Sequence, residues 1–154
     1  MRVLIAYDTV SRMRLTEKVA ETIASMLKEA GLDVDSFFAP NVDTAVVKNY
    51  DCVLVGAPTM AFKASAGIMQ FLNSLPNNEF SGKLAAAFDT QVQWRFSGSA
   101  SKGIENKLRD LGFKLVTASL ITYVEGKQDA MQLKEGELEK AKNWAKTIAE
   151  TVTK

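Results

Sequence analysis

The sequence of 154 residues contains no histidine and only one cysteine. The absence of histidine excludes Ser-His-Asp and Cys-His nucleophiles, most zinc sites and acid–base catalysis by imidazole. The one cysteine, Cys52, permits neither an internal disulfide nor a cysteine-based metal cluster. Because Cys52 lies in an apolar run, we expect it to be a buried small hydrophobe rather than a reactive thiol. An enzyme of this composition would depend on a bound cofactor for its reactivity.

Neither sign of charge dominates, and long apolar runs are also missing. The net charge of +1 gives no electrostatic reason to expect binding to nucleic acid or to an anionic membrane. The longest apolar stretch, residues 84–88, is far shorter than the roughly 20 residues that span a bilayer. The N-terminus has no signal-peptide pattern. We therefore expect a cytoplasmic protein, and the length predicts one domain over residues 1–154.

Short apolar stretches alternate along the chain with longer stretches of helical periodicity. Continuous apolar runs predict strands covered on both faces at residues 3–7, 52–56, 84–89 and 114–124. Residues 33–38 alternate in polarity, which indicates a strand nearer the sheet edge. Apolar residues at three- and four-residue spacing predict helices at residues 16–30, 68–75, 101–111 and 136–152, with a short helix at 42–48.

This alternation predicts an α/β fold with a parallel sheet and right-handed crossovers. Five strands in this length favour a three-layer, doubly wound sheet of the flavodoxin-like type, in the strand order 2-1-3-4-5. Sheets of this kind bind ligands at the carboxyl ends of their strands, next to the switch in strand order. The candidate site therefore consists of the loops after the first, third and fourth strands.

The loop after the first strand opens directly into a helix. The unpaired N–H groups and the dipole of a helix N-terminus favour a phosphate. Possible hydroxyl and guanidinium donors are Thr9, Ser11, Arg12, Arg14 and Thr16. The alternative is that Thr16 only caps the helix, while Asp8 and Thr9 shape a turn.

The loops after the third and fourth strands carry large apolar side chains. Met60 and Phe62 could pack against a flat ring or turn inward into the core. Trp94 could stack on an aromatic ring or act as a lid over the sheet edge. A phosphate seat beside two such loops suits a phosphorylated, flat cofactor.

Several segments resemble the flavodoxin family, and in pattern most closely the flavodoxin domain of A-type flavoproteins. They are residues 3–9 (VLIAYDT), 16–20 (TEKVA), 56–59 (GAPT), 83–89 and 111–113. The resemblance implies an FMN cofactor whose phosphate is held by Thr9, Ser11 and Thr16. It further implies that one side of the flavin is lined by Pro58, Thr59, Met60 and Ala61, and the other by Asp89, Thr90, Gln91 and Trp94. The first loop departs from the family pattern, because it is longer and has Met13-Arg14-Leu15 where glycine is usual. The helix could instead begin near Arg12, with Ser11 as its cap.

The resemblance implies an electron-transfer protein with redox partner proteins, as a monomer or weak dimer. The alternatives are an FMN-dependent reductase of quinone-type acceptors, or a domain that has lost FMN and acts as a binding module. The sequence lacks the motifs of other protein classes that have related folds. The third strand ends at Gly56 and has no receiver-domain aspartate, and no Gly-x-Gly-x-x-Gly follows the first strand. A cobalamin-binding histidine is also absent.

Overall fold

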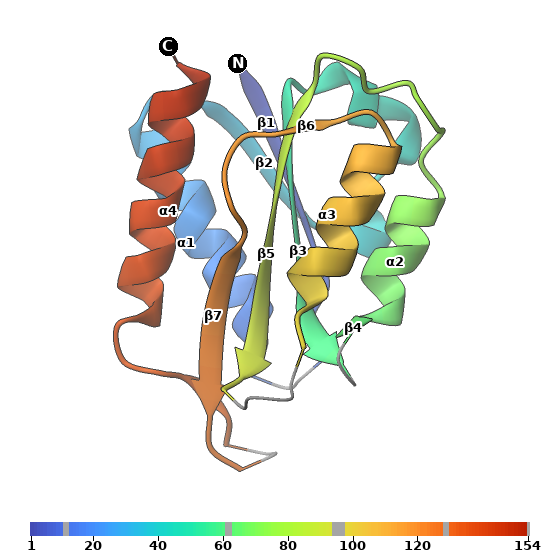
Figure 1. Cartoon of the computed structure of the whole chain (residues 1–154). Helices are drawn as coiled ribbons and strands as arrows, with labels where there is room; N and C mark the ends of the chain where they lie inside the picture. Colours follow the sequence, from blue (N-terminus) through green and yellow to red (C-terminus); the bar gives the residue numbers. More distant parts are fainter. Residues whose placement is uncertain (11–12, 61–62, 94–97, 128–129, 154) are drawn as a thin grey trace.

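The computed structural model describes residues 1–10, 13–60, 63–93, 98–127 and 130–153 (Figure 1). The helices are α1 (Leu15–Glu29), α2 (Ala66–Asn73), α3 (Ala100–Asp110) and α4 (Glu137–Val152), with the 3₁₀ helices η1 (Ala39–Asn41) and η2 (Thr44–Asn49). The strands are β1 (Arg2–Tyr7), β2 (Asp33–Phe38), β3 (Cys52–Met60), β4 (Lys63–Ala64), β5 (Leu84–Val92), β6 (Lys114–Leu115), β7 (Leu120–Glu125) and β8 (Gln132–Leu133).

The sheet has the order β2-β1-β3-β5-β7-β8. The five strands that the sequence predicts are β1, β2, β3, β5 and the β6–β7 segment, and their neighbours in this order pair in parallel. The predicted order 2-1-3-4-5 is therefore confirmed. Helices α1 and α4 cover one face of the sheet, and α2 and α3 cover the other (Figure 1).

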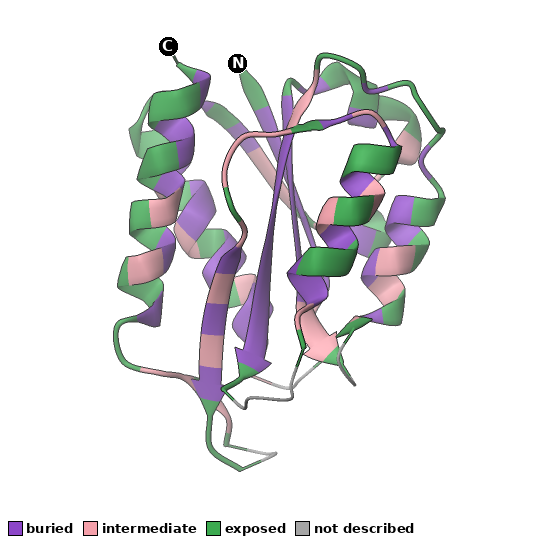
Figure 2. Ribbon diagram, in the orientation of Figure 1, coloured by how far each residue is buried: buried purple, intermediate pink, exposed green. Residues whose placement is uncertain are grey.

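The central strands are largely buried (Figure 2), and their side chains are apolar on both faces because each face packs against a helical layer. In β1, Val3 and Ile5 belong to the cluster beneath α1 and α4, whereas Leu4 and Ala6 belong to the cluster beneath α2 and α3. Strands β3 and β5 alternate in the same way, as the two-residue period of a strand requires. Cys52 is fully buried in β3, and burial raises the pKa of its thiol to about 12, as expected for a packing residue.

The structure differs from the sequence prediction at several element ends. The strand predicted over residues 114–124 is two strands, β6 and β7, and the indole N–H of Trp144 donates to the carbonyl of Ala118 in the break between them. The helix predicted over 42–48 is the 3₁₀ helix η2, and Asp43, the residue before it, accepts from the N–H of Ala45. The short antiparallel strands β4 and β8 were not predicted.

Strands β3 and β5 extend further than their apolar runs indicate. β3 continues to Met60 and β5 to Val92, so Pro58, Thr59, Thr90 and Gln91 lie within strands rather than in loops. Pairing holds these residues in register, with Ala57 opposite Asp89 and Pro58 opposite Thr90. The polar ends of the central strands thereby form one rigid edge of the sheet. None of the described helices is both long and apolar enough to cross a membrane.

Gly56 provides a test of the packing beneath this edge. A Cβ at position 56 would lie 2.0 Å from the ring of Phe88, which is fully buried. We expect Gly56→Ala to lower the free energy of unfolding by about 1–3 kcal/mol, because the ring must move within a packed core. Urea unfolding monitored by circular dichroism measures the loss. The matched control is Gly103→Ala in α3, where nothing lies within 4 Å and a gain of about 0.5–1 kcal/mol is expected. Equal effects of the two substitutions would contradict this account.

Candidate cofactor-binding site

A hollow of about 160 Å³ lies where the carboxyl ends of β1, β3, β5 and β7 meet. We call it the strand-end hollow. Among the residues predicted to bind the cofactor, its lining includes Thr9, Thr16, Pro58, Thr59, Thr90 and Gln91. The other described lining residues are Val10, Leu15, Val92, Val124 and Met131. Ser11, Arg12, Ala61 and Trp94 lie outside the described residues, so their predicted roles remain predictions.

The hydroxyl of Thr16 reaches the strand-end hollow from the first turn of α1. The helix begins at Leu15, so Thr16 lies inside the helix rather than at its cap position. Its Oγ1 lies 2.8 Å from Oγ1 of Thr90, and this hydrogen bond joins α1 to the end of β5. The first N–H groups of a helix have no partner within the helix. The start of α1 therefore brings N–H donors and a hydroxyl to the same place.

Arg14 lies just before α1 but does not line the strand-end hollow. Its backbone is left-handed, with φ 49° and ψ 48°. Its guanidinium is 3.6 Å from the carboxylate of Glu17, and the side chain is 69% exposed. Glu17 also accepts a hydrogen bond of 2.7 Å from the hydroxyl of Tyr7, whose pKa is raised to about 12 by burial and by this contact. The predicted contact between Arg14 and a phosphate remains a prediction, and in this arrangement Arg14 is held towards Glu17.

Asp89 is fully buried near the end of β5 and is tied to the start of α3. Its carboxylate accepts from the hydroxyl of Ser99 at 2.7 Å, from the N–H of Ser101 at 3.3 Å and from the amide of Gln91 at 3.1 and 3.2 Å. Burial raises the pKa of Asp89, and these hydrogen bonds oppose that shift. Asp89 is thus a support of the site, and it is not among the described residues that line the strand-end hollow.

Thr59 and Asp8 also connect strand ends to helix starts. The hydroxyl oxygen of Thr59 accepts from the N–H of Ala100, the first residue of α3, at 2.9 Å. The carboxylate of Asp8 accepts from the N–H of Thr9 at 2.9 Å and from the hydroxyl of Ser65, the residue before α2. Gly67 in α2 leaves room for the Asp8 carboxylate, because a Cβ at position 67 would lie 2.7 Å from it. These contacts join the ends of β1 and β3 to the starts of α2 and α3.

Several residues of this site were not predicted from the sequence. Ser65 and Ser99 precede helices, which is a recognisable signal of their capping position, but their bonds to Asp8 and Asp89 depend on the folded sheet. Val124 and Met131 reach the strand-end hollow from β7 and the hairpin after it. The predicted strand order places the fifth strand beside the fourth, so the end of the fifth strand, where Val124 lies, could have been predicted to border the site.

The chemistry of the strand-end hollow fits the phosphate and the flat ring of FMN. Its described lining combines threonine hydroxyls with apolar surfaces and includes no charged side chain. Hydroxyls and helix N–H groups bind phosphate oxygens, while proline, valine and methionine side chains pack on an aromatic ring. A volume of about 160 Å³ is below the roughly 300–1,000 Å³ typical of ligand pockets, so the described residues enclose only part of such a ligand.

Comparison with known proteins identifies the class of protein that this fold and site define. A sequence profile described as flavodoxin matches residues 9–144. The chain therefore belongs to the flavodoxin family, and the resemblance found in the sequence is confirmed.

One sequence relative and several solved structures are similar to this chain, and the structures share its fold. The chain is 29% identical over 122 residues to a probable flavodoxin 2 of Bacillus subtilis, which covers 77% of this chain and 80% of the relative. The structure of oxidised flavodoxin 2 from Bacillus cereus has a TM-score of 0.83 at 24% identity, over 97% of this chain and 99% of that one. Rubredoxin oxygen:oxidoreductase from Desulfovibrio gigas has a TM-score of 0.78 at 22% identity, over 99% of this chain and 36% of that one.

The raised pKa of Asp89 predicts a pH dependence of stability. A carboxyl whose pKa is higher in the folded state binds its proton more readily when folded. The quantity to compare is the free energy of unfolding of the wild type minus that of Asp89→Asn. This difference should rise as the pH falls from about 7 through the raised pKa of Asp89. It should level off at about pH 4, where the carboxyl is protonated in the unfolded chain as well. Urea unfolding of the FMN-free protein across this range measures the difference. The control is Asp110→Asn at the exposed end of α3. Parallel profiles for the wild type and Asp89→Asn would contradict the prediction.

Proposed function

We propose that this flavodoxin carries electrons on an FMN held at the strand-end hollow, with the phosphate at the start of α1. Membership of the family confirms the predicted function of an FMN-binding electron-transfer protein, and the placement of the cofactor is our proposal. One observation carries it. Thr9, Thr16 and Thr90 line a single hollow together with Leu15, the first residue of α1, and the hydroxyls of Thr16 and Thr90 are in contact there.

The chain's own residues would bind and orient the cofactor. Thr9 and Thr16 would donate to the phosphate together with the N–H groups that begin α1. Pro58 and Thr59 lie on β3, and Thr90 and Gln91 lie beside them on β5, so these four residues offer the ring one surface made of paired strands. Bound FMN supplies the electron chemistry, since its ring accepts and donates electrons. A surface held by paired strands would fix the orientation of the ring.

The charge distribution favours a reduced cofactor. Asp8 and Asp89 are the acidic residues at the ends of β1 and β5. Both are buried and hydrogen-bonded, and neither is among the described residues that line the strand-end hollow. The described lining contains no carboxylate. Negative charge added to the ring is therefore not repelled by any carboxylate among these residues. The absence of this repulsion raises the reduction potential relative to a site lined by carboxylates.

The family match does not favour the other two functions that the sequence left open, the quinone-type reductase and the FMN-free binding module. We propose that the partners of the protein are redox proteins. We also propose a cytoplasmic location and a monomer or weak dimer.

The phosphate contact can be tested by comparing FMN with riboflavin, which lacks the phosphate. We expect Thr16→Val to weaken FMN binding about tenfold or more, because a hydrogen bond to a charged group is lost. Riboflavin binding should change by less than about twofold, because riboflavin makes no such bond. Quenching of flavin fluorescence during titration of the FMN-free protein measures both affinities. The loss of the Thr16–Thr90 hydrogen bond affects both ligands alike, so riboflavin corrects for it.

The control variant is Thr22→Val on the same helix, where the hydroxyl bonds to the carbonyl of Lys18. It should leave the preference for FMN over riboflavin unchanged. Equal weakening of both flavins by Thr16→Val would place the phosphate elsewhere. If the wild-type protein does not quench the fluorescence of micromolar FMN, the proposed function is overturned.

A further inference from the structure

A second hollow lies between β4 and the start of α3. Its volume is about 360 Å³, and it is lined mainly by Lys63, Ala64, Met69, Ser99, Lys102 and Asn106. We call it the lysine hollow. Both lysines are exposed, and the described lining contains no carboxylate. Two cations beside the apolar surface of Ala64 and Met69 favour a group that is negatively charged and carried on an apolar stem.

The lysine hollow adjoins the proposed cofactor site. Lys63 lies opposite Met60 in the β3–β4 pair, and Met60 follows Thr59 in β3. Thr59 lines the strand-end hollow and also binds the N–H of Ala100 at the start of α3. The same end of β3 and the same helix start therefore border both hollows. A molecule seated in the lysine hollow would lie next to the flavin.

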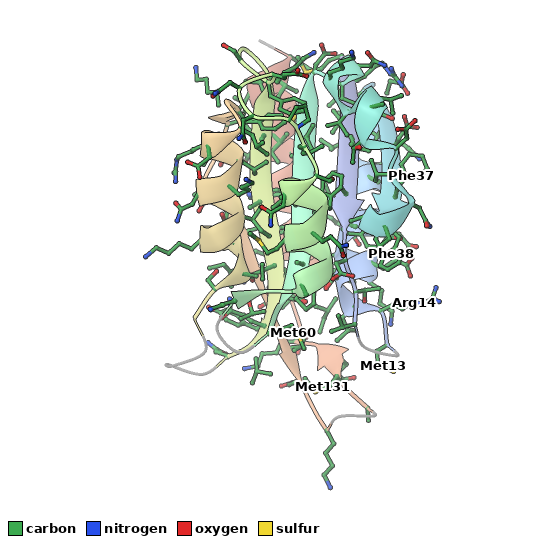
Figure 3. The ribbon with its side chains drawn as sticks, turned by 90° about the vertical axis from the view of Figure 1, so that its right-hand side faces the viewer. Met13, Arg14, Phe37, Phe38, Met60 and Met131 are labelled. Carbon is green, nitrogen blue, oxygen red and sulfur yellow. The ribbon has the colours of Figure 1, made fainter. Side chains whose placement is uncertain are left out.

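Large apolar side chains are exposed along the same edge of the molecule. Val10, Met60 and Val92 are 55%, 46% and 54% exposed, although all three are strongly apolar. Met13 and Met131, which are half-buried, lie at the same end of the molecule as Met60 (Figure 3). We call these five residues the apolar rim. Val10, Val92 and Met131 also line the strand-end hollow, so the apolar rim borders the proposed cofactor site. Exposed apolar side chains gathered at one edge indicate contact with another macromolecule, and methionine adapts its shape to such a contact.

Positive charge predominates among the described residues around the apolar rim. The exposed cations are Lys63, Lys102 and Lys127, with Arg14 beside Glu17, and the exposed carboxylates are Glu125 and Glu135. Lys134 is half-buried, and its ammonium donates to the side-chain oxygen of Gln93 at 2.6 Å. The two aspartates at the strand ends do not redress this balance, because both are buried. A partner with surface carboxylates would therefore be attracted to this edge, and a basic partner would not.

We propose that an acidic redox protein docks on this edge of the molecule. Its carboxylates lie in the lysine hollow between Lys63 and Lys102, and its apolar contacts fall on the apolar rim. This arrangement would bring its redox centre towards the cofactor site. The inference rests on the proposed function for the redox nature of the partner and adds the chemistry by which the partner is recognised.

The first experiment measures docking without any electron transfer. FMN-loaded, oxidised protein with ¹³C-labelled methionine methyl groups is titrated with succinylated cytochrome c, whose lysines carry carboxylates, and separately with native cytochrome c, which is basic. The methyl signals of Met60, Met69 and Met131 should shift with the succinylated protein. The signal of Met26, which lies between α1 and α4, should not shift. A larger response to native cytochrome c, or shifts at Met26 equal to those at Met60, would overturn the proposal. Flavin fluorescence of the same sample tests FMN binding separately.

The second experiment reverses one charge of the lysine hollow. Protein reduced with dithionite is mixed with ferric cytochrome c, and each haem takes one electron from the reduced flavin. At low ionic strength Lys102→Glu should slow reduction of the succinylated protein about threefold to tenfold and accelerate reduction of the native one. A glutamate in the first turn of α3 favours the helix, so folding should be preserved. Lys146→Glu on α4 changes the net charge equally and should alter either rate by less than about twofold. Equal effects of the two substitutions would overturn the proposal.

Discussion

Burial of the three central strands on both faces is the constraint on which the rest of this structure depends. Within β1, β3 and β5, side chains alternate between two helix-covered cores, so a polar side chain there would lose water without gaining a partner. Polar residues can therefore enter these strands only near their ends. Asp8 follows β1, Thr59 lies near the end of β3, and Asp89 lies near the end of β5. The fold thereby determines where the chemistry of the protein can occur.

Each of these polar strand ends is joined to the start of a helix that comes later in the chain. Asp8 binds Ser65 before α2, while Thr59 and Asp89 bind the first residues of α3. A helix N-terminus carries partial positive charge, so it offsets part of the cost of a buried carboxylate. The same arrangement directs both carboxylates away from the strand-end hollow. The acidic residues thus stabilise the loops and leave the ligand-binding surface uncharged.

The sheet and its strand order could be predicted from the sequence because burial on both faces produces short, continuous apolar runs. Residues 33–38 were predicted as a strand with the bounds that β2 has in the structure, since its alternating pattern reflects a position at the sheet edge. The break between β6 and β7 could not be predicted, because Ala118 there accepts a hydrogen bond from Trp144, 26 residues further along the chain.

Six of the predicted cofactor-binding residues line the strand-end hollow, namely Thr9, Thr16, Pro58, Thr59, Thr90 and Gln91. Their proximity follows from strand order alone. The supporting contacts do not, because Thr59 and Ala100 are 41 residues apart and Thr16 and Thr90 are 74 apart. Such pairs leave no periodic pattern in the sequence. The hydrogen bonds of Asp89 to Ser99 and Ser101 were likewise not predicted, and its predicted contact with the flavin remains a prediction.

The start of α1 shows how a loop without glycine still presents a helix N-terminus. Arg14 adopts a left-handed backbone, which costs an L-residue about 1–2 kcal/mol. The next residue, Leu15, is almost fully buried, and burial of a leucine stabilises by about 1.5–3 kcal/mol. Burial of Leu15 can therefore offset the strain at Arg14, and the following hydrogen bond between Thr16 and Thr90 adds to that balance. Because the guanidinium of Arg14 is held by Glu17, a phosphate at this helix would depend on N–H groups and hydroxyls rather than on that charge.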